Sequence, residues 1–205
     1  MSNTITVVMF ISLLILVNDS IADQDLNLLK ESLGRQLYFD KNLSLNRTQS
    51  CASCHDPEIG FVDATNNASE RSASLGDDGK SLGDRSAPTS SYANQIPHFH
   101  EHEKGQYVGG QFWDGRASTL ADQAAGPPLN PGEMGMPSKS AVAERLMENP
   151  LYIQSFKQAY GQNIFSDSDA TYDAFANAIA AFEETDYFSP FDSKYDRYIR
   201  GEYTL

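Results

Sequence analysis

The chain has 205 residues, which is enough for one domain with a proper hydrophobic core or for two small domains. Its formal net charge is −13. A surface this acidic repels nucleic acid and anionic lipid, so we expect no nucleic-acid partner; the charge serves solubility, or it would suit a basic electron-donor protein.

The first 22 residues have the features of a secretory signal. An apolar run extends from Val7 to Val17, and Ser20-Ile21-Ala22 follows at the positions that a signal peptidase reads. Because the run is too short to span a bilayer, we expect residues 1–22 to be a cleaved signal peptide. No Lys or Arg precedes the run, so an uncleaved membrane anchor is the alternative. No later segment of the sequence could cross a membrane.

The mature chain, residues 23–205, is expected to form a single domain that begins with a helix. Leucines recur at helical spacing and predict an amphipathic helix over residues 25–38. Residues 63–91 are rich in Ser, Asp, Gly and Asn, which predicts a long exposed loop. Residues 92–137 hold aromatics, glycines and prolines without clear periodicity, which is typical of a segment that wraps a site or a cofactor. One short helix is predicted there, at 117–125.

Helices return after Pro137. Residues 138–147 predict one helix, and Asn149-Pro150 is a cap followed by a proline at the first helical position of the next. Gly161 is a natural stop for that helix, and Ser168 can cap another. The apolar positions expected to line these helices are Val142, Leu146, Tyr152, Ile153, Phe156, Tyr160, Tyr172, Phe175, Ile179 and Phe182.

The pattern as a whole favours an all-α fold with long irregular loops. No run of alternating strands and no internal repeat is visible. A C-terminal tail is expected from about Ser189.

Cys51 and Cys54 are the only cysteines of the chain, and His55 follows directly. In an exported protein, C-x-x-C-H is the attachment signature of c-type haem. Two thiols at this spacing at a helix start can reach the two vinyl groups at one porphyrin edge. The adjacent histidine then falls under the iron as its proximal ligand. The sequence therefore predicts one covalent haem c in a cytochrome c-like domain.

Three other uses of the two cysteines compete with haem attachment. A disulfide between them leaves His55 unexplained. A redox-active pair would normally lie in a βαβ context, and none is visible. Zinc would want four ligands, and the chain has no second cysteine pair.

Several further stretches occur in a recognisable order and cover nearly all of the mature chain. They are LGRQLYFDKNLS (33–44), CASCH (51–55), RSAPT (85–89), GGQFWDGRASTLADQAAGPPLNPGEMGMP (109–137) and AIAAFEET (178–185). Together they resemble the bacterial di-haem cytochrome c peroxidase family, including its MauG-type members that oxidise protein side chains. The resemblance implies a periplasmic enzyme that reduces hydrogen peroxide with electrons from a donor such as a small cytochrome or cupredoxin.

The resemblance extends only to the family's N-terminal, peroxidatic haem domain. The second domain of the family would begin with its own C-x-x-C-H shortly after YDRYIRGEYTL, and this chain has no second attachment motif. We therefore expect a half-length member: a genuine single-haem protein, one product of a split gene, or a truncated chain. A separate haem domain is a possible partner.

Site residues beyond the C-x-x-C-H segment follow from the resemblance. Glu133 matches the distal carboxylate, and Gln123 and Pro127 match residues near the distal face. Trp113 matches the tryptophan between the two haems, and Arg116 could pair with a haem propionate. Peroxide reduction moves a proton from one peroxide oxygen to the other, and a single carboxylate can carry it. From the residues alone, the alternatives are an exposed glutamate, a core tryptophan and an ordinary salt bridge between the arginine and its neighbouring aspartate.

Two departures from the family pattern affect the iron and a calcium site. Residues 63–84 contain no histidine, whereas some members supply a sixth iron ligand from this loop; MauG-type members also lack it, which implies a five-coordinate iron. Ser86 stands where the family's calcium site uses an asparagine, which argues against calcium. Other candidates for a sixth ligand, with a surface loop or packing as the alternative, are His98, His100, His102, Met134 and Met136.

The leading interpretation is an exported peroxidase-like oxidoreductase with one haem c. The alternatives are a mono-haem electron-transfer cytochrome without turnover of its own, and one half of a split two-haem peroxidase.

Overall fold

The computed structural model describes residues 23–64 and 72–204. The expected signal peptide, residues 1–22, lies outside the described residues. Within the described ranges, no helix has both the length and the apolar character needed to cross a membrane.

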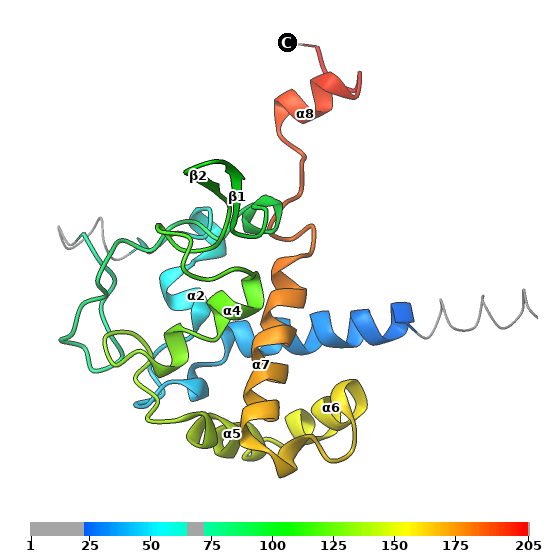
Figure 1. Cartoon of the computed structure of the whole chain (residues 1–205). Coiled ribbons are helices and arrows are strands. Elements are labelled where there is room, and N and C mark those ends of the chain that lie inside the picture. The colour runs from blue at the N-terminus through cyan, green and yellow to red at the C-terminus, as the bar shows by residue number, and fades with distance from the viewer. Residues whose placement is uncertain (1–22, 65–71, 205) are drawn as a thin grey trace, which may run out of the picture.

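Helix α7 (Ser168–Glu183) runs through the centre of the fold (Figure 1). Its cap is Asp167, one residue before the expected cap at Ser168, and the carboxylate accepts hydrogen bonds from the main-chain N–H groups of Asp169 and Ala170. The side chains predicted to face inward from this helix are all buried: Tyr172, Phe175, Ile179 and Phe182. The helical periodicity therefore predicted the buried face of α7.

Residues 23–39 form the first helix, which confirms the helix predicted at 25–38. Gly34 lies where this helix crosses α7. A Cβ added at Gly34 would lie 1.8 Å from the carbonyl oxygen of Ala178, so only glycine lets the two backbones come this close. Leu33 and Leu37 are buried beside this crossing.

Helices α5 (Lys139–Met147) and α6 (Pro150–Tyr160) complete the helical side of the molecule. The side chains of Ser138 and Asn149 cap them by accepting hydrogen bonds from main-chain N–H groups in the first turn. Gly161 ends α6 with a φ of 100°. Both predicted helices are confirmed with their ends, because caps and stops are local signals.

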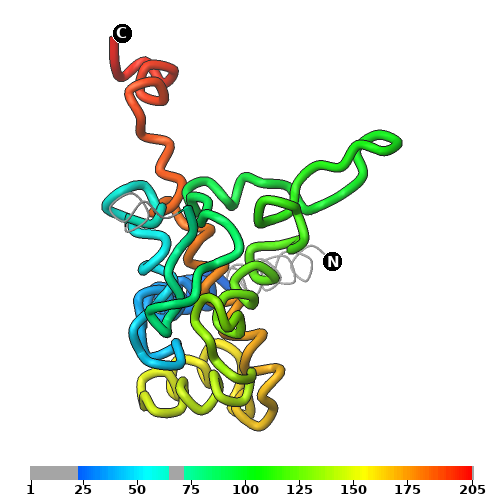
Figure 2. The backbone as a smooth tube through the Cα atoms, turned by 90° about the vertical axis from the view of Figure 1, so that its left-hand side faces the viewer, coloured from blue at the N-terminus to red at the C-terminus, as the bar shows by residue number. Residues whose placement is uncertain are grey.

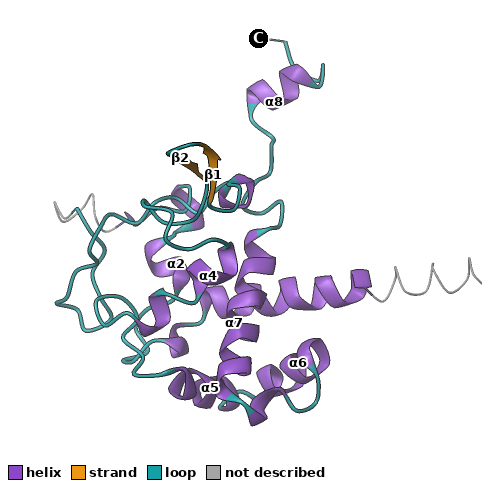
Figure 3. Ribbon diagram, viewed as in Figure 1, coloured by secondary structure: helices purple, strands orange, loops and turns teal. Residues whose placement is uncertain are grey.

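A small hairpin is a feature that the sequence did not indicate. Strands β1 (His100–Glu103) and β2 (Gln106–Val108) pair antiparallel, with His100 opposite Val108. All seven residues are exposed, so the strands have no buried face and show no apolar alternation for a pattern search to find. The other named elements are helices, and the all-α prediction is confirmed (Figure 3).

The C-terminal segment expected to be a tail contains a further helix, α8 (Lys194–Ile199), which stands away from the body of the molecule in both Figure 1 and Figure 2. Single turns of 3-10 helix connect the larger elements: η1 (Lys41–Leu43), η2 (Pro57–Ile59), η3 (Ala93–Gln95), η4 (Pro127–Leu129) and η5 (Ile164–Ser166).

Of the loop predicted at 63–91, residues 65–71 lie outside the described residues, and residues 72–91 form a loop that is not exposed throughout. Ala73, Ser74, Asp77 and Ser90 are buried. The prediction of an exposed loop is wrong for these residues: Ser74 and Ser90 line a pocket, and Asp77 is hydrogen-bonded to Asn46 and Thr48. Figure 3 shows the loops gathered on the side of the molecule that carries α2 (Cys51–Cys54) and α4 (Leu120–Ala124).

Candidate active site

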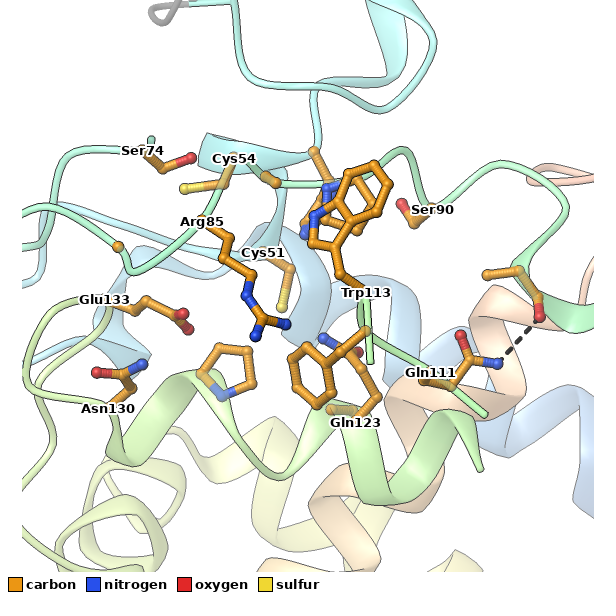
Figure 4. Close-up of a pocket in the computed structure, with 18 of the residues that line it drawn as sticks. Cys51, Cys54, Ser74, Arg85, Ser90, Gln111, Trp113, Gln123, Asn130 and Glu133 are labelled. Carbon is orange, nitrogen blue, oxygen red and sulfur yellow. Dashed lines mark hydrogen bonds between the residues drawn. The ribbon is translucent and has the colours of Figure 1, made fainter. Parts of the chain in front are cut away.

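A pocket of about 540 Å³ opens between the loops and α7 (Figure 4). Its volume lies within the roughly 300–1,000 Å³ typical of pockets for small molecules and cofactors. The walls come from α2, the loop at 83–90, the segment 111–116, α4 with η4, and the end of α7. Every site residue expected from the sequence lines this pocket: Cys51, Cys54, His55, Trp113, Arg116, Gln123, Pro127 and Glu133.

Both cysteines are free thiols on the short helix α2. Burial raises the pKa of Cys51, with a further upward contribution from Glu183, and burial raises the pKa of Cys54 to about 11. A redox-active cysteine has a lowered pKa, so this environment does not suit a redox pair. Among the described residues, no group of three or more His, Cys, Asp or Glu side chains could hold a metal ion, so the thiols belong to no zinc site there.

His55 ends α2, and its ring is fixed by the main chain around it. Nδ1 lies 3.3 Å from the carbonyl oxygen of Phe61, and because a carbonyl only accepts, the proton is assigned to Nδ1. Nε2 then carries the free lone pair, which is the form that binds a metal. Burial lowers the pKa of His55, against smaller upward contributions from the carbonyls of Phe61 and Pro88, so the ring stays neutral. The hydroxyl of Tyr38 donates to the His55 carbonyl at 3.3 Å.

These features together fit a covalently attached haem. Two half-buried, unpaired thiols and a neutral histidine with a defined tautomer line the same cavity. Among the described residues, the thiols are neither joined to each other nor grouped with further metal ligands.

Glu133 lines the same pocket, from the irregular loop after η4. Figure 4 shows its carboxylate directed into the pocket, with Asn130 beside it. The side chain is partly buried, and burial raises its pKa, with Arg116 opposing and Asp84 adding to the shift. The alternative of an ordinary exposed glutamate is therefore wrong. A carboxyl with a raised pKa holds its proton closer to neutral pH, as a proton-transfer group should.

Gln123 and Pro127 occupy the wall next to Glu133. Gln123 belongs to α4, the short helix predicted at 117–125, which begins after a capping box between Thr119 and Asp122. Pro127 opens η4. This wall is tied to the core because the Tyr172 hydroxyl, from α7, donates to the carbonyl at the end of α4 at 2.7 Å.

Trp113 lies at the rim of the pocket and is 64% exposed, so the expectation of core packing for this residue is wrong. Its indole N–H donates to the carbonyl oxygen of Ser86 at 2.8 Å. Asp114 lies between two arginines, with 2.9 Å contacts to both Arg85 and Arg116. The ordinary salt bridge expected as the alternative for Arg116 is present, and exposed pairs of this kind add little stability.

The pocket residues to which sequence reasoning assigned no role include Ser74, Arg85, Asn130 and Glu183. Glu183 is 5% exposed, and its Oε2 has no hydrogen-bond partner in the described part of the chain. Burial, followed by the neighbouring Glu184, raises its pKa to about 8. The inward-facing position of Glu183 could have been predicted from the sequence, because Glu183 lies four residues after Ile179 on the inward face of α7.

The other candidate iron ligands divide between two places. His98, His100 and His102 are exposed on or beside β1, and none of them lines the pocket. Met136 is buried in the hydrophobic core. Met134 belongs to the same core and also lines the pocket, so it is the one of these candidates that the fold brings to the site.

A sequence model of the di-haem cytochrome c peroxidase family matches residues 29–204. The chain is 51% identical to the methylamine utilization protein MauG of Paracoccus denitrificans over 171 residues, which cover 83% of this chain and 44% of that protein. It is 39% identical to the cytochrome c peroxidase Ccp of Escherichia coli over 173 residues, which cover 84% of this chain and 31% of that protein.

Solved structures show the same partial overlap. The diheme peroxidase BthA from Burkholderia thailandensis superimposes with a TM-score of 0.78 at 30% identity, over 86% of this chain and 43% of that one. A MauG-like protein associated with microbial copper homeostasis gives a TM-score of 0.67 at 31% identity. The chain spans less than half the length of each of these proteins.

Proposed function

The chain belongs to the di-haem cytochrome c peroxidase family, and on that premise we propose that it is a peroxidase-like haem oxidoreductase of the bacterial periplasm. It reduces hydrogen peroxide to water with electrons from an external donor. The observation that carries the proposal is that a single pocket holds both the C-x-x-C-H segment and the partly buried carboxyl of Glu133.

The C-x-x-C-H segment is the proposed haem attachment site. Cys51 and Cys54 would form the two thioether bonds, and Nε2 of His55 would ligate the iron while the Phe61 carbonyl orients its ring through Nδ1. One bound haem c would supply the site at which peroxide binds and would pass the electrons of the external donor to it.

Glu133 is the proposed proton carrier. Reduction of one peroxide to two waters consumes two electrons and two protons. Before the bond between the peroxide oxygens breaks, one proton must move from one oxygen to the other. Glu133 accepts that proton from one oxygen and returns it to the other, which its raised pKa favours. Gln123 offers an amide that can hydrogen-bond to the substrate, and the Pro127 ring covers the adjoining wall without competing for the proton.

Trp113 is the proposed point of electron entry. Its indole is exposed at the rim, held by the Ser86 carbonyl, and it reaches the same pocket from outside. A donor docked on this rim could be a small cytochrome, a cupredoxin or a separate haem domain. The net charge of −13 favours a donor with a basic docking face.

The test is Glu133→Gln in haem-loaded protein. The change keeps the shape of the side chain and removes proton transfer, so the reaction with peroxide should slow by about a hundredfold or more, within the roughly 10²–10⁴-fold range of general acid–base groups. Glu144→Gln, on the exposed side of α5, is the matched control and should react like the wild type. An unchanged rate in Glu133→Gln would contradict the proposal, as would wild-type protein that never reacts with peroxide even with a haem partner supplied.

One observation favours a second candidate, a mono-haem electron-transfer cytochrome. Such proteins hold iron with two protein ligands, often a histidine and a methionine. Met134 is 4% exposed and lines the pocket, so its sulfur is available for that role. A low-spin ferric spectrum that Met134→Leu converts to high spin would favour this candidate over the peroxidase.

A further inference from the structure

Asp77 is a buried carboxylate that sequence reasoning placed in an exposed loop. It is 6% exposed and does not line the pocket. Its oxygens accept hydrogen bonds from the main-chain N–H of Asn46 at 2.5 Å, the main-chain N–H of Thr48 at 3.2 Å and the Thr48 hydroxyl at 2.5 Å. Burial pushes the pKa of Asp77 up, but hydrogen bonds from Thr48, Ser44 and Asn46 outweigh it and hold the pKa below its usual value.

The main chain of Asp77 is bonded in two directions. Its N–H donates to the carbonyl oxygen of Glu133 at 2.7 Å. Its own carbonyl accepts from the Thr48 hydroxyl at 3.0 Å and from the Asn46 side chain at 3.4 Å. Asp77 therefore joins the segment at 44–49 directly to the residue that carries the proposed proton-transfer carboxyl.

Two further contacts lie on either side of the hydrogen bond between Asp77 and Glu133. The N–H of Leu45 donates to the Met134 carbonyl at 2.9 Å, one residue after Glu133. A Cβ added at Gly76 would lie 2.8 Å from the carbonyl oxygen of Gly132, one residue before Glu133, so the backbones touch there. Residues 132–134 are thus held at three successive positions by segments distant in sequence.

The segment at 44–49 is itself anchored to a helix. Arg145 of α5 donates to the carbonyl oxygens of Asn42 at 2.7 Å, Ser44 at 3.1 Å and Leu45 at 3.1 Å. The connection runs from α5 through this segment to Asp77 and then to Glu133. An irregular loop lacks the regular main-chain hydrogen bonds of a helix or a sheet, so the geometry of its side chains depends on hydrogen bonds from other segments.

We propose that Asp77 is the positioning residue for Glu133: its carboxylate locks the 44–49 segment, and its N–H holds the Glu133 main chain so that the carboxyl projects into the pocket. The proposal rests on the proposed function for the role of Glu133 as a proton carrier. A displacement of about 1 Å of a reacting group can cost on the order of a hundredfold in rate. Asp77 can therefore affect the rate by fixing the position of Glu133, without contacting the substrate.

The test is Asp77→Asn in haem-loaded protein, alone and combined with Glu133→Gln. The amide keeps the volume but turns donors toward the N–H groups of Asn46 and Thr48, which disrupts the lock. We expect Asp77→Asn alone to slow the peroxide reaction by about tenfold or more, and to change the rate by less than about twofold when Glu133 is already glutamine. Equal losses in both backgrounds would overturn the proposal, because Asp77 would then act on the fold and not through Glu133.

Cyanide association supplies a readout without turnover. Hydrogen cyanide loses its proton as it binds haem iron, so the pH profile of its association reports a base in the pocket. Asp77→Asn should shift that profile in the same direction as Glu133→Gln. If the wild type fails to reduce peroxide, the proposed function fails, yet the cyanide profiles still decide whether Asp77 acts through Glu133. Profiles that change in Glu133→Gln but not in Asp77→Asn would overturn the positioning role.

Two further variants guard against misfolding and nonspecific effects. Asp78→Asn is the matched control, since in the described ranges that exposed carboxylate bonds only to Lys80 and Ser81 within its own turn, and its rates and profile should match the wild type. Thr48→Val removes the one hydroxyl that contacts both the carboxylate and the main-chain carbonyl of Asp77, and it leaves the hydrogen bonds from the main-chain N–H groups of Asn46 and Thr48. If Asp77→Asn loses its haem, Thr48→Val is measured in its place, alone and combined with Glu133→Gln. We expect Thr48→Val to slow the peroxide reaction and to shift the cyanide profile in the same direction as Asp77→Asn, but by less. A Thr48→Val protein with an unchanged peroxide rate and an unchanged cyanide profile would overturn the proposal.

Discussion

Replacing Glu183 by glutamine should stabilise the protein, by an amount that grows as the pH rises. The carboxyl is 5% exposed, and its Oε2 lacks a hydrogen-bond partner among the described residues. Burial, and then the charge of Glu184, raises its pKa from 4.5 to about 8. Between these pH values the folded protein keeps a proton that the unfolded chain has released. Each rise in pH therefore stabilises the unfolded state relative to the folded state. The free energy of unfolding therefore falls with increasing pH in this window.

The magnitude follows from the size of the pKa change. One pKa unit corresponds to about 1.4 kcal/mol, so the difference in proton binding at Glu183 lowers the free energy of unfolding by about 3 kcal/mol at pH 7 and by about 5 kcal/mol above pH 8. Glutamine resembles the protonated acid and does not titrate. The difference in unfolding free energy between Glu183→Gln and wild type should thus be small near pH 4.5 and should level off above pH 8.

The assay is urea unfolding of the haem-loaded ferric protein across this pH range, with the two proteins measured side by side. Glu184→Gln is the matched control: it removes the second cause of the shift but leaves the buried carboxyl, so most of the pH dependence should remain. A difference between Glu183→Gln and wild type that stays constant with pH would refute the reasoning. A variant less stable than wild type at every pH would show that the carboxyl has a partner in the loaded protein.

Three further predictions concern the haem and its electrons. Protein made with a haem-ligation system should carry one haem on Cys51 and Cys54, and it should keep its colour after denaturation; a loss of colour, or bound zinc, would contradict haem attachment. The ferric protein should be largely high-spin and should bind cyanide without prior reduction, because in the described residues His55 is the sole histidine that lines the pocket; a fully low-spin spectrum would contradict this. Trp113→Phe should slow electron delivery in stopped-flow measurements while peroxide binding stays nearly unchanged, and an unaltered electron-transfer rate would remove Trp113 from the proposed route.

Local chemistry explains which features could be predicted from the chain alone. The ends of α6 were predicted because Asn149, Pro150 and Gly161 act on their immediate neighbours. The C-x-x-C-H segment was interpretable for the same reason, since the two sulfurs and the histidine need only their own spacing to define a haem attachment site.

Trp113 shows where sequence reasoning lacked information. A single large aromatic side chain is expected in a core, yet this one is 64% exposed because the Ser86 carbonyl, from another loop, holds its indole at the rim. Which face of an irregular segment turns outward depends on contacts that local residue patterns do not encode. The resemblance placed Trp113 at the site, but the fold alone showed its exposure.

Asp77 and Glu183 show most clearly which features local sequence patterns do not predict. Spacing and composition determined the helices, the haem attachment segment and the family resemblance, all of which depend on residues near each other in the chain. The burial of these two carboxyls depends on residues far away: Asp77 is held by Asn46 and Thr48, and Glu183 is enclosed where α7 meets the pocket wall beside Cys51. A polar side chain is buried only where the fold supplies partners or excludes water, so its pKa and its role are decided by tertiary contacts and not by its neighbours in sequence.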